Sequence, residues 1–277
     1  MNRLSRSSTI LFCFLLSLYS LSVGKAKADD WPMWRFDAGR TNVSAEKIPA
    51  SLHLQWQRHL PPVQPAFRKS RLQFDQGYEP IAVRDSLFVA LPHIDSVVAY
   101  AAKSGDEQWR FVADGPVRLA PAAWQGRVYF GSDDGHVYCL NASDGKLHWK
   151  FRAVPSNRKL LGNGRLISVW PVRGGPVIAD GTLYIAAGVW PLEGVFVYAI
   201  DAESGKVIWV NDRGGSLYGQ TPHNGQAMGG LSPQGYLLIN GNELLVPCGT
   251  ARPARFDRET GEIVDFSLPG EGGSPGG

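Results

Sequence analysis

Residues 138–149 read YCLNASDGKLHW, and this stretch decides the fold because related segments occur elsewhere in the chain. They stand at 98–109 (VAYAAKSGDEQW), at 198–209 (YAIDAESGKVIW) and at 254–264 (ARFDRETGEIV). Successive glycines of the four segments are 40, 60 and 56 residues apart. Self-similarity at such a period is typical of repeat architectures in which each repeat forms one supersecondary unit.

Each residue type in the repeat has a physical role in an antiparallel hairpin. Asn141, Asp201 and Asp257 follow an apolar strand, where their side chains can bond the backbone of the turn. The glycine that comes next supplies a positive φ at the end of the hairpin. A second strand then leaves the turn, and its tryptophan is expected to cover the seam between neighbouring sheets. We therefore interpret these tryptophans as structural docking residues: Trp109, Trp149 and Trp209.

Another strand-rich segment precedes each repeat, at 86–89, 127–130, 182–185 and 243–246. Asp134-Gly135 between two such strands is a strong hairpin signal. Each unit thus contains four antiparallel strands, which is the composition of a propeller blade. The sequence predicts an all-β fold, a β-propeller of four-stranded antiparallel blades with four repeats. An additional outer strand is predicted at 54–57, where it would complete a neighbouring blade.

The repeats resemble those of the pyrroloquinoline-quinone-like (PQQ-like) β-propeller family, whose usual form is Ala-x-Asp-x-x-Thr-Gly-Lys-x-x-Trp. The opening at 30–35, DWPMWR, also resembles the start of mature proteins in that family. The resemblance covers most of residues 30–266 and implies the propeller fold. It leaves the function open, because quinoprotein dehydrogenases and the non-enzymatic outer-membrane assembly lipoprotein share the repeat. The sequence departs from the pattern at Ala101, Asp144 and Asp265, and the last of these replaces the docking tryptophan.

The number of repeats is low for this family, whose members usually close seven or eight blades. Four repeats predict a partial or truncated propeller over residues 29–268, and a four-bladed ring is the alternative. Residues 269–277 contain mostly glycine and proline and are expected to form a flexible tail.

The N-terminus has the features of a secretory signal peptide over residues 1–28. Arg3 and Arg6 precede an apolar run at 10–21, and Ala26-Lys27-Ala28 provides a cleavage site. Removal of this segment leaves 24 basic and 25 acidic residues, a net charge of −1. A balanced charge does not favour nucleic-acid binding. We expect a periplasmic or secreted protein without a transmembrane span after cleavage.

Two long insertions, at 153–172 and 211–234, interrupt the regular repeat and each follows a tryptophan-ended strand. Long loops on a rigid propeller are where binding usually resides. Equivalent places in successive blades would bring both insertions to one rim, with Arg173 at the start of an inner strand. Its guanidinium could present a planar fork to an acidic ligand. The hypothesis is one shared ligand site, formed by Trp170, Arg173, Tyr218, His223 and Asn224.

The sequence favours a binding protein or scaffold over an enzyme. Cys139 and Cys248 are interpreted as buried thiols, and no metal spacing, nucleophile motif or catalytic residue is predicted. The resemblance implies adjacent cysteines and a calcium-bound quinone for dehydrogenases of the family, but this chain contains no Cys-Cys pair. No cofactor is therefore expected, and an unidentified protein or small molecule is the expected partner. The alternatives are a PQQ-dependent oxidoreductase that uses calcium, and the N-terminal fragment of a larger multidomain protein.

Overall fold

The computed structural model describes residues 30–66, 75–162, 164–214, 217–220, 226–249 and 251–267. The predicted signal peptide and the predicted C-terminal tail lie outside them. The first sheet comprises β1 (Ile81–Val83), β2 (Ser86–Leu91), β3 (Ser96–Ala101) and β4 (Glu107–Val112). The second sheet comprises β5 (Ala122–Trp124), β6 (Arg127–Gly131), β7 (His136–Asn141) and β8 (Leu147–Arg152).

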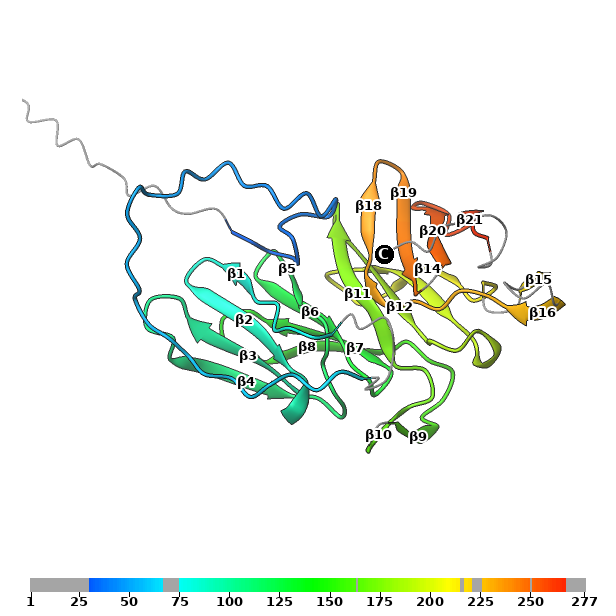
Figure 1. Ribbon diagram of the computed structural model, residues 1–277, viewed down its shortest axis with the longest axis horizontal. Helices are drawn as coiled ribbons and strands as arrows, with labels where there is room; N and C mark the ends of the chain where they lie inside the picture. Colours follow the sequence, from blue (N-terminus) through cyan, green and yellow to red (C-terminus); the bar gives the residue numbers. More distant parts are fainter. Residues whose placement is uncertain are drawn as a thin grey trace, which may run out of the picture.

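The third sheet comprises β11 (Val172–Ala179), β12 (Thr182–Ala187), β13 (Phe196–Asp201) and β14 (Val207–Asn211), and the short β17 (Gly235–Tyr236) runs parallel to β11. The fourth sheet comprises β18 (Leu238–Asn240), β19 (Glu243–Cys248), β20 (Ala251–Asp257) and β21 (Ile263–Asp265). Consecutive strands within each sheet are antiparallel, and the sheets follow one another in chain order (Figure 1). The predicted all-β propeller class is therefore confirmed.

Burial within a blade follows from the position of each strand in its sheet. The four central residues of β7 are all buried, because β7 has a strand on both sides and neighbouring sheets cover its faces. The outer strand β8 alternates between exposed and half-buried residues, and Trp149 is one of the half-buried ones. Side chains therefore join the core where the blades face one another and meet solvent at the perimeter.

The docking tryptophans connect each sheet to the next through one repeated contact. The indole Nε1 of Trp109 donates to Ala142 O at 3.0 Å, and that of Trp149 donates to Ala202 O at 3.1 Å. Each ring also lies over the glycine of the turn it reaches: a Cβ added to Gly145 would come within 2.6 Å of the Trp109 ring. This glycine has a φ of +68°, so the position needs glycine for both its backbone conformation and its close packing.

Trp209 makes the third such contact, to Arg258 O at 3.0 Å on the fourth sheet. Trp56 makes the same contact on the first sheet, where its Nε1 donates to Ala102 O at 2.8 Å. The strand predicted at 54–57 is wrong, because these residues pair with no strand within the described part of the chain. The backbone there is held by the hydrogen bond of the Trp56 indole and not by pairing with a neighbouring strand. Asp265 takes the tryptophan position of the last repeat, opposite Arg255 on β20.

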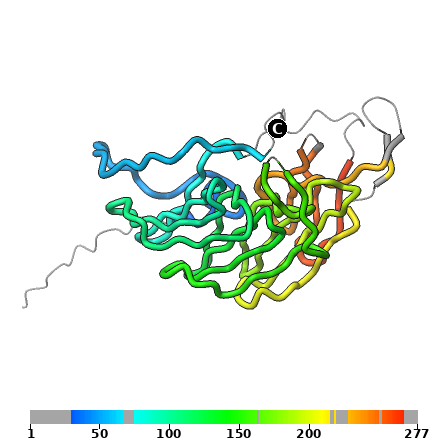
Figure 2. The backbone as a smooth tube through the Cα atoms, turned by 90° about the horizontal axis from the view of Figure 1, so that it is seen from below, coloured from blue at the N-terminus to red at the C-terminus, as the bar shows by residue number. Residues whose placement is uncertain are grey.

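Residues 31–40, here called the strap, cross the inner strands of all four sheets. The strap contacts them in chain order, through Trp31 with Ala82, Pro32 with Ala123, Met33 with Ile178 and Ala38 with Ile239. Figure 1 shows it in dark blue beside β5 and the end of β11, and Figure 2 shows the blades in the perpendicular view. The strap joins the inner edges of the blades, whereas the tryptophans join their outer parts.

Arg40 fixes the end of the strap between the third and fourth sheets. Its guanidinium donates to Trp34 O at 2.9 Å, to Pro176 O at 2.8 Å and to Leu237 O at 2.9 Å. The side chain is buried, and burial lowers its pKa to about 10. The helical turns in the described part of the chain, η1 (Pro92–Ile94) and η2 (Pro191–Glu193), are too short to cross a membrane.

Candidate binding site

The two insertions each contain a β-hairpin, and both hairpins lie against η2. The first insertion forms β9 (Lys159–Gly162) and β10 (Arg165–Ser168), and the second forms β15 (Leu217–Gln220) and β16 (Gln226–Gly229). Arg158, directly before β9, forms an ion pair with Glu193 of η2. β16 contacts η2 as well, so the structure gives the two insertions a common neighbour.

Trp170 joins the first insertion to η2 from within the protein. Its Nε1 donates to Glu193 O, and its side chain is buried. The guanidinium of Arg158 lies over its ring, 5.2 Å from the centroid. Such a cation–π contact is strongest where water is excluded. Most of the indole therefore contacts the protein, and what it fixes is the position of the hairpin.

Arg173 is the second residue of β11, and its side chain is only 1% exposed. Its Nε and Nη2 donate to the two carboxylate oxygens of Asp133, at 2.5 and 2.8 Å. Asp133 belongs to the turn between β6 and β7, so the bidentate pair bridges the second and third sheets. The acid that this arginine binds in the structure is thus a side chain of the protein itself.

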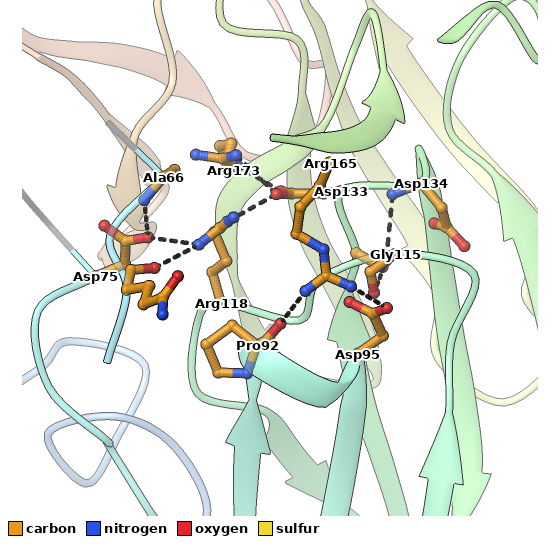
Figure 3. Close-up of polar contacts among 12 residues, drawn as sticks. Ala66, Asp75, Pro92, Asp95, Gly115, Arg118, Asp133, Asp134, Arg165 and Arg173 are labelled. Atoms are coloured by element: carbon orange, nitrogen blue, oxygen red, sulfur yellow. Dashed lines mark hydrogen bonds and ion pairs between the residues drawn. The ribbon is translucent and has the colours of Figure 1, made fainter. Parts of the chain in front are cut away.

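Arg118 and Asp75 extend this pair into a buried ionic cluster (Figure 3). Arg118 donates from Nε to Asp133 Oδ2 at 2.7 Å and from Nη1 to Asp75 Oδ2 at 3.2 Å. Asp75 Oδ2 also accepts the Ala66 backbone N–H at 2.8 Å. Burial raises the pKa of Asp75, and the Arg118 charge opposes that shift. The two arginines and two aspartates balance in charge, as a buried cluster requires.

Sequence reasoning singled out Arg173 but not its partners. A signal was present, because Arg118 and Arg173 stand at the same repeat position, three residues before Pro121 and Pro176 respectively. Both side chains reach Asp133, which lies in a turn without a repeated motif. The spacing could have identified the two arginines as equivalent residues of successive repeats. Only the packing of the sheets identifies the carboxylate that they share.

The first hairpin also reaches back to the first sheet. Arg165 on β10 donates to Pro92 O at 2.9 Å and forms an ion pair with Asp95, next to η1 (Figure 3). Arg165 thus connects the hairpin to the turn between β2 and β3 of the first blade. Arg158 connects it to η2, which lies between β12 and β13 of the third blade. The hairpin therefore covers this end of the second blade.

A cleft of about 540 Å³ lies between β9 and η2. Its walls combine apolar and charged side chains, namely Arg158, Lys159, Leu160, Val169, Trp190, Leu192 and Glu193. Trp190 is 56% exposed and Leu192 is 72% exposed. Leu161 and Leu166, paired across the hairpin, are also exposed. Large apolar side chains gathered in solvent with cations beside them are typical of a recognition surface.

The remaining predicted site residues belong to the second insertion. Tyr218 on β15 is 69% exposed. His223 and Asn224 lie outside the described residues. The structure therefore places Trp170 and Arg173 within the protein and Tyr218 at its surface, with η2 between the two insertions.

The carboxylates of Asp75 and Asp133 and both cysteine thiols of the described residues lie in the interior of the protein. No group of three or more His, Cys, Asp or Glu side chains in the described ranges is arranged to hold a metal ion. The carboxylates of Asp75 and Asp133 are occupied by arginines. Cys139 and Cys248 are buried free thiols on the second and fourth sheets, so they do not form the adjacent pair expected of the dehydrogenases.

Known proteins resemble this chain in parts of their length. The quinone-dependent alcohol dehydrogenase subunit of Gluconacetobacter polyoxogenes is 41% identical over 95 residues, which are 34% of this chain and 12% of that protein. The tetrathionate hydrolase of Acidithiobacillus ferrooxidans is 33% identical over 100 residues, 36% of this chain and 17% of the relative. The chain thus spans less than a fifth of either relative.

Solved structures share the fold at lower identity. The quinohemoprotein alcohol dehydrogenase of Comamonas testosteroni superposes with a TM-score of 0.64 and 19% identity, over 90% of this chain and 42% of that one. BamB of Moraxella catarrhalis gives a TM-score of 0.50 and 20% identity, over 69% and 52% of the two chains. The sequence profile described as outer membrane protein assembly factor BamB matches residues 28–169, about half of the chain. Together with the repeats and their docking tryptophans, this match confirms the predicted resemblance: the chain belongs to the BamB-like family of PQQ-like repeat propellers.

Proposed function

We propose that this protein is an exported, non-catalytic β-propeller that binds a partner protein through the cleft between β9 and η2. The exposed Trp190 and Leu192 beside Lys159 are the observation that carries the proposal. Aromatic and aliphatic anchors surrounded by charge are what protein interfaces use for affinity and specificity. The ionic cluster supports this role, because it fixes the blades on which the cleft is built.

The proposed contact surface extends to the second insertion. Tyr218, His223 and Asn224 are the candidates there for directional contacts with the partner or with a small ligand. Trp170 and Arg173 complete this predicted set as positioning residues, since the first is bonded to η2 and the second to Asp133. Mutation of these two residues should affect binding through the geometry of the rim.

A photo-crosslinking residue at Leu192 tests the cleft in cells that express the whole chain. The matched control carries the same residue at Leu54, which is 82% exposed on a different part of the surface. We expect one discrete protein adduct from the cleft position alone, and its yield should fall about tenfold with Trp190→Ala. Identical adducts from both positions, or none from either, would contradict a binding cleft.

Export is part of this proposal and has its own test. The signal features predict cleavage after Ala28, so N-terminal sequencing of the mature protein should begin at Asp29. Recovery outside the cytoplasm should accompany cleavage. An intact Met1 in a membrane fraction would show instead that the segment serves as an anchor.

The second candidate is a quinoprotein oxidoreductase, or a fragment of one. It is favoured by the identity of 41% with the dehydrogenase subunit named above. Addition of pyrroloquinoline quinone with calcium, followed by dye-linked alcohol oxidation, separates the two candidates. We expect no turnover, because the cysteine pair is missing from the sequence and the carboxylates of Asp75 and Asp133 are held by arginines. A third reading, the N-terminal piece of a multidomain protein, is tested by reading the gene past residue 277.

A further inference from the structure

A second cleft, of about 460 Å³, lies at the end of the second blade where β7 begins and β8 ends. Its lining combines three basic side chains with an amide and an aromatic ring, namely His136, Lys150, Arg152, Asn157 and Phe151. No carboxylate of the described residues belongs to this lining, and the cleft shares no lining residue with the one between β9 and η2. A concave surface with side-chain N–H donors and no acidic group favours an anionic ligand.

The pairing of β7 with β8 brings the three basic side chains to one face of the blade. His136 lies directly opposite Arg152. The next residue on the same face of β8, Lys150, lies opposite Tyr138. Residues two apart on a strand share a face, and residues directly opposite one another are neighbours. The three basic residues therefore form one cluster, in which like charges oppose one another until an anion binds.

The blade architecture does not require this cluster, because the other blades carry different residues at the same register positions. In the first blade the pair equivalent to that of His136 and Arg152 is Ser96 with Val112. In the third blade the position of Lys150 is taken by valine, opposite a tyrosine as in the second. These blades fold with small or apolar residues there, so folding alone does not account for the basic residues of the second blade.

Arg152 is the member of the cluster whose charge has no counterpart in the described part of the chain. Among these residues its guanidinium forms no hydrogen bond and no ion pair. Lys150, by contrast, is bound to Asp114 at 2.8 Å. A guanidinium presents a planar fork of donors that matches the oxygens of phosphate or sulfate. Arg152 can therefore bind an oxyanion without losing an existing contact.

His136 is held in one orientation by Asp134. The Nδ1 of its ring lies 3.4 Å from Asp134 Oδ1, and its backbone N–H donates to the same oxygen at 2.8 Å. Burial would raise the pKa of Asp134, but the hydrogen bonds from His136 and from the Tyr138 hydroxyl outweigh burial and hold this pKa below its ordinary value of 3.8. The ionised carboxylate favours a proton on Nδ1, so Nε2 is the ring nitrogen left for a ligand in the cleft.

We infer that this cleft binds a phosphate or sulfate group, with the guanidinium of Arg152 as the main contact. Lys150 supplies a second positive charge, and the Asn157 amide supplies a directional hydrogen bond. His136 binds in its imidazolium form, in which both ring nitrogens donate. A volume of about 460 Å³ is in the range of small-molecule sites, so the group can be a free ion or part of a larger molecule such as an anionic lipid.

Calorimetric titration of the purified protein with sodium sulfate and with sodium phosphate, at an ionic strength held constant with chloride, tests the site. We expect saturable binding of one anion per chain, and Arg152→Gln should raise the dissociation constant at least about tenfold. Arg110→Gln on β4 is the matched control, because it removes an exposed arginine and changes the net charge equally. It should leave the dissociation constant unchanged. No saturable binding of either anion, or equal effects of the two variants, would overturn the inference.

A negative charge placed in the cleft tests the location. Asn157→Asp keeps nearly the same size and repels an anion, so it should raise the dissociation constant at least about tenfold. Asn240→Asp, at an exposed position of the fourth sheet, is the control and should have no effect. Equal melting temperatures of the two variants would show that the fold is unchanged. Unaltered binding in Asn157→Asp would contradict a site in this cleft.

Vesicle flotation separates a free ion from a lipid headgroup as the source of the anion. If the headgroup is the ligand, the protein should float with phosphatidylglycerol vesicles but not with phosphatidylcholine vesicles, and Arg152→Gln should abolish flotation. If the free ion is the ligand, the protein should float with neither and should still bind the ions in the titration. Flotation with phosphatidylglycerol that persists in Arg152→Gln would contradict the cleft as the anion site.

Discussion

At the scale of single residues, the docking tryptophan acts through several weak contacts made at once. Trp149 donates one hydrogen bond across the seam, packs over Gly205 and lies 5.9 Å from the ring of Tyr129. The indole can pack against its neighbours and make its hydrogen bond only when the two blades are in this one relative position. The same contact recurs at every seam for which the sequence contains a tryptophan.

We therefore expect Trp149→Ala to lower the free energy of unfolding by roughly 3–5 kcal/mol, as for other large aromatic residues in packed sites. Asp265→Ala is the matched control at the equivalent position of the last repeat. Asp265 is exposed and lies 3.4 Å from Arg255, so its loss should cost less than about 1 kcal/mol. Denaturant unfolding measures both values, and similar losses would show that the tryptophan does not hold the seam.

At the scale of elements, the turns of the third and fourth repeats are closed by an aspartate carboxylate that accepts hydrogen bonds from backbone N–H groups of the turn. Asp201 Oδ1 accepts hydrogen bonds from Ser204 N at 2.8 Å and from Ser204 Oγ at 2.5 Å. These bonds lower the pKa of Asp201 below its ordinary value of 3.8. The second repeat has Asn141 at this position, and its turn forms through the backbone hydrogen bond from Gly145 N to Asn141 O.

The lowered pKa predicts an acid dependence that Asp201→Asn should remove. The folded state favours the ionised carboxylate, so its contribution is present above the unfolded pKa and is lost as the pH falls through the folded pKa. The variant should be less stable than the parent protein near neutral pH. The difference in melting temperature should shrink as the pH falls below the ordinary Asp pKa of 3.8. A difference that is constant across this range would exclude ionisation as the cause.

The β9–β10 hairpin is held at its two sides by separate arginines. Arg165 binds next to η1 and Arg158 binds η2, whereas the hairpin itself has two short strands. A two-stranded hairpin is marginal without such support. The hairpin should therefore be able to detach while the blades remain folded.

Arg165→Ala should increase proteolytic cleavage within residues 157–169 and leave the main unfolding transition nearly unchanged. The effect should be confined to the hairpin, because the lost contacts connect the hairpin to the first sheet and contribute little to the packing of the sheets themselves. Arg110→Ala removes an exposed ion pair with Glu107 elsewhere and serves as the control. Equal cleavage in both variants, or a large shift of the main transition with Arg165→Ala, would show that the hairpin is part of the cooperative core.

At the scale of the whole molecule, the strap joins the inner strands of the blades and the tryptophans join their outer strands. The tryptophans connect each sheet to the next, and Trp56 donates to the corresponding acceptor on the first sheet, Ala102 O. The strap connects the inner strands, and Arg40 ties it to carbonyl groups 136 and 197 residues away. Neighbouring blades are thus joined at two places, which favours cooperative unfolding.

Arg40→Met should cost roughly 2–4 kcal/mol, because it leaves three carbonyl oxygens without their donor although it removes a buried charge. Arg35→Met, in the same strap but exposed, should cost less than about 1 kcal/mol. Calorimetry should show a lower and broader transition for the first variant. Equal stability of the two variants would remove Arg40 as the tie between the blades.

The sequence by itself determined the blades, because their information is local and repeated. A glycine and a tryptophan within twelve positions, preceded by an Asx residue in the second and third repeats, define one hairpin and its docking contact, and the three complete repeats share one register. The prediction of a strand at 54–57 was wrong because strand formation, unlike the hairpin motif, depends on a distant partner. Its tryptophan has the docking role, but strand pairing needs a neighbouring strand, and the local sequence does not say whether there is one.

Only the tertiary structure decided what the polar residues of the rim do. Arg173 had the chemistry to bind an acidic ligand, and the packing of two blades supplied Asp133 as its partner instead. Arg118 and Asp75 joined the same cluster from other segments of the chain. A charged side chain that is removed from water needs a partner of opposite charge. That partner is chosen by which surfaces meet, and residues far apart in the sequence leave no periodic signal of where they will meet.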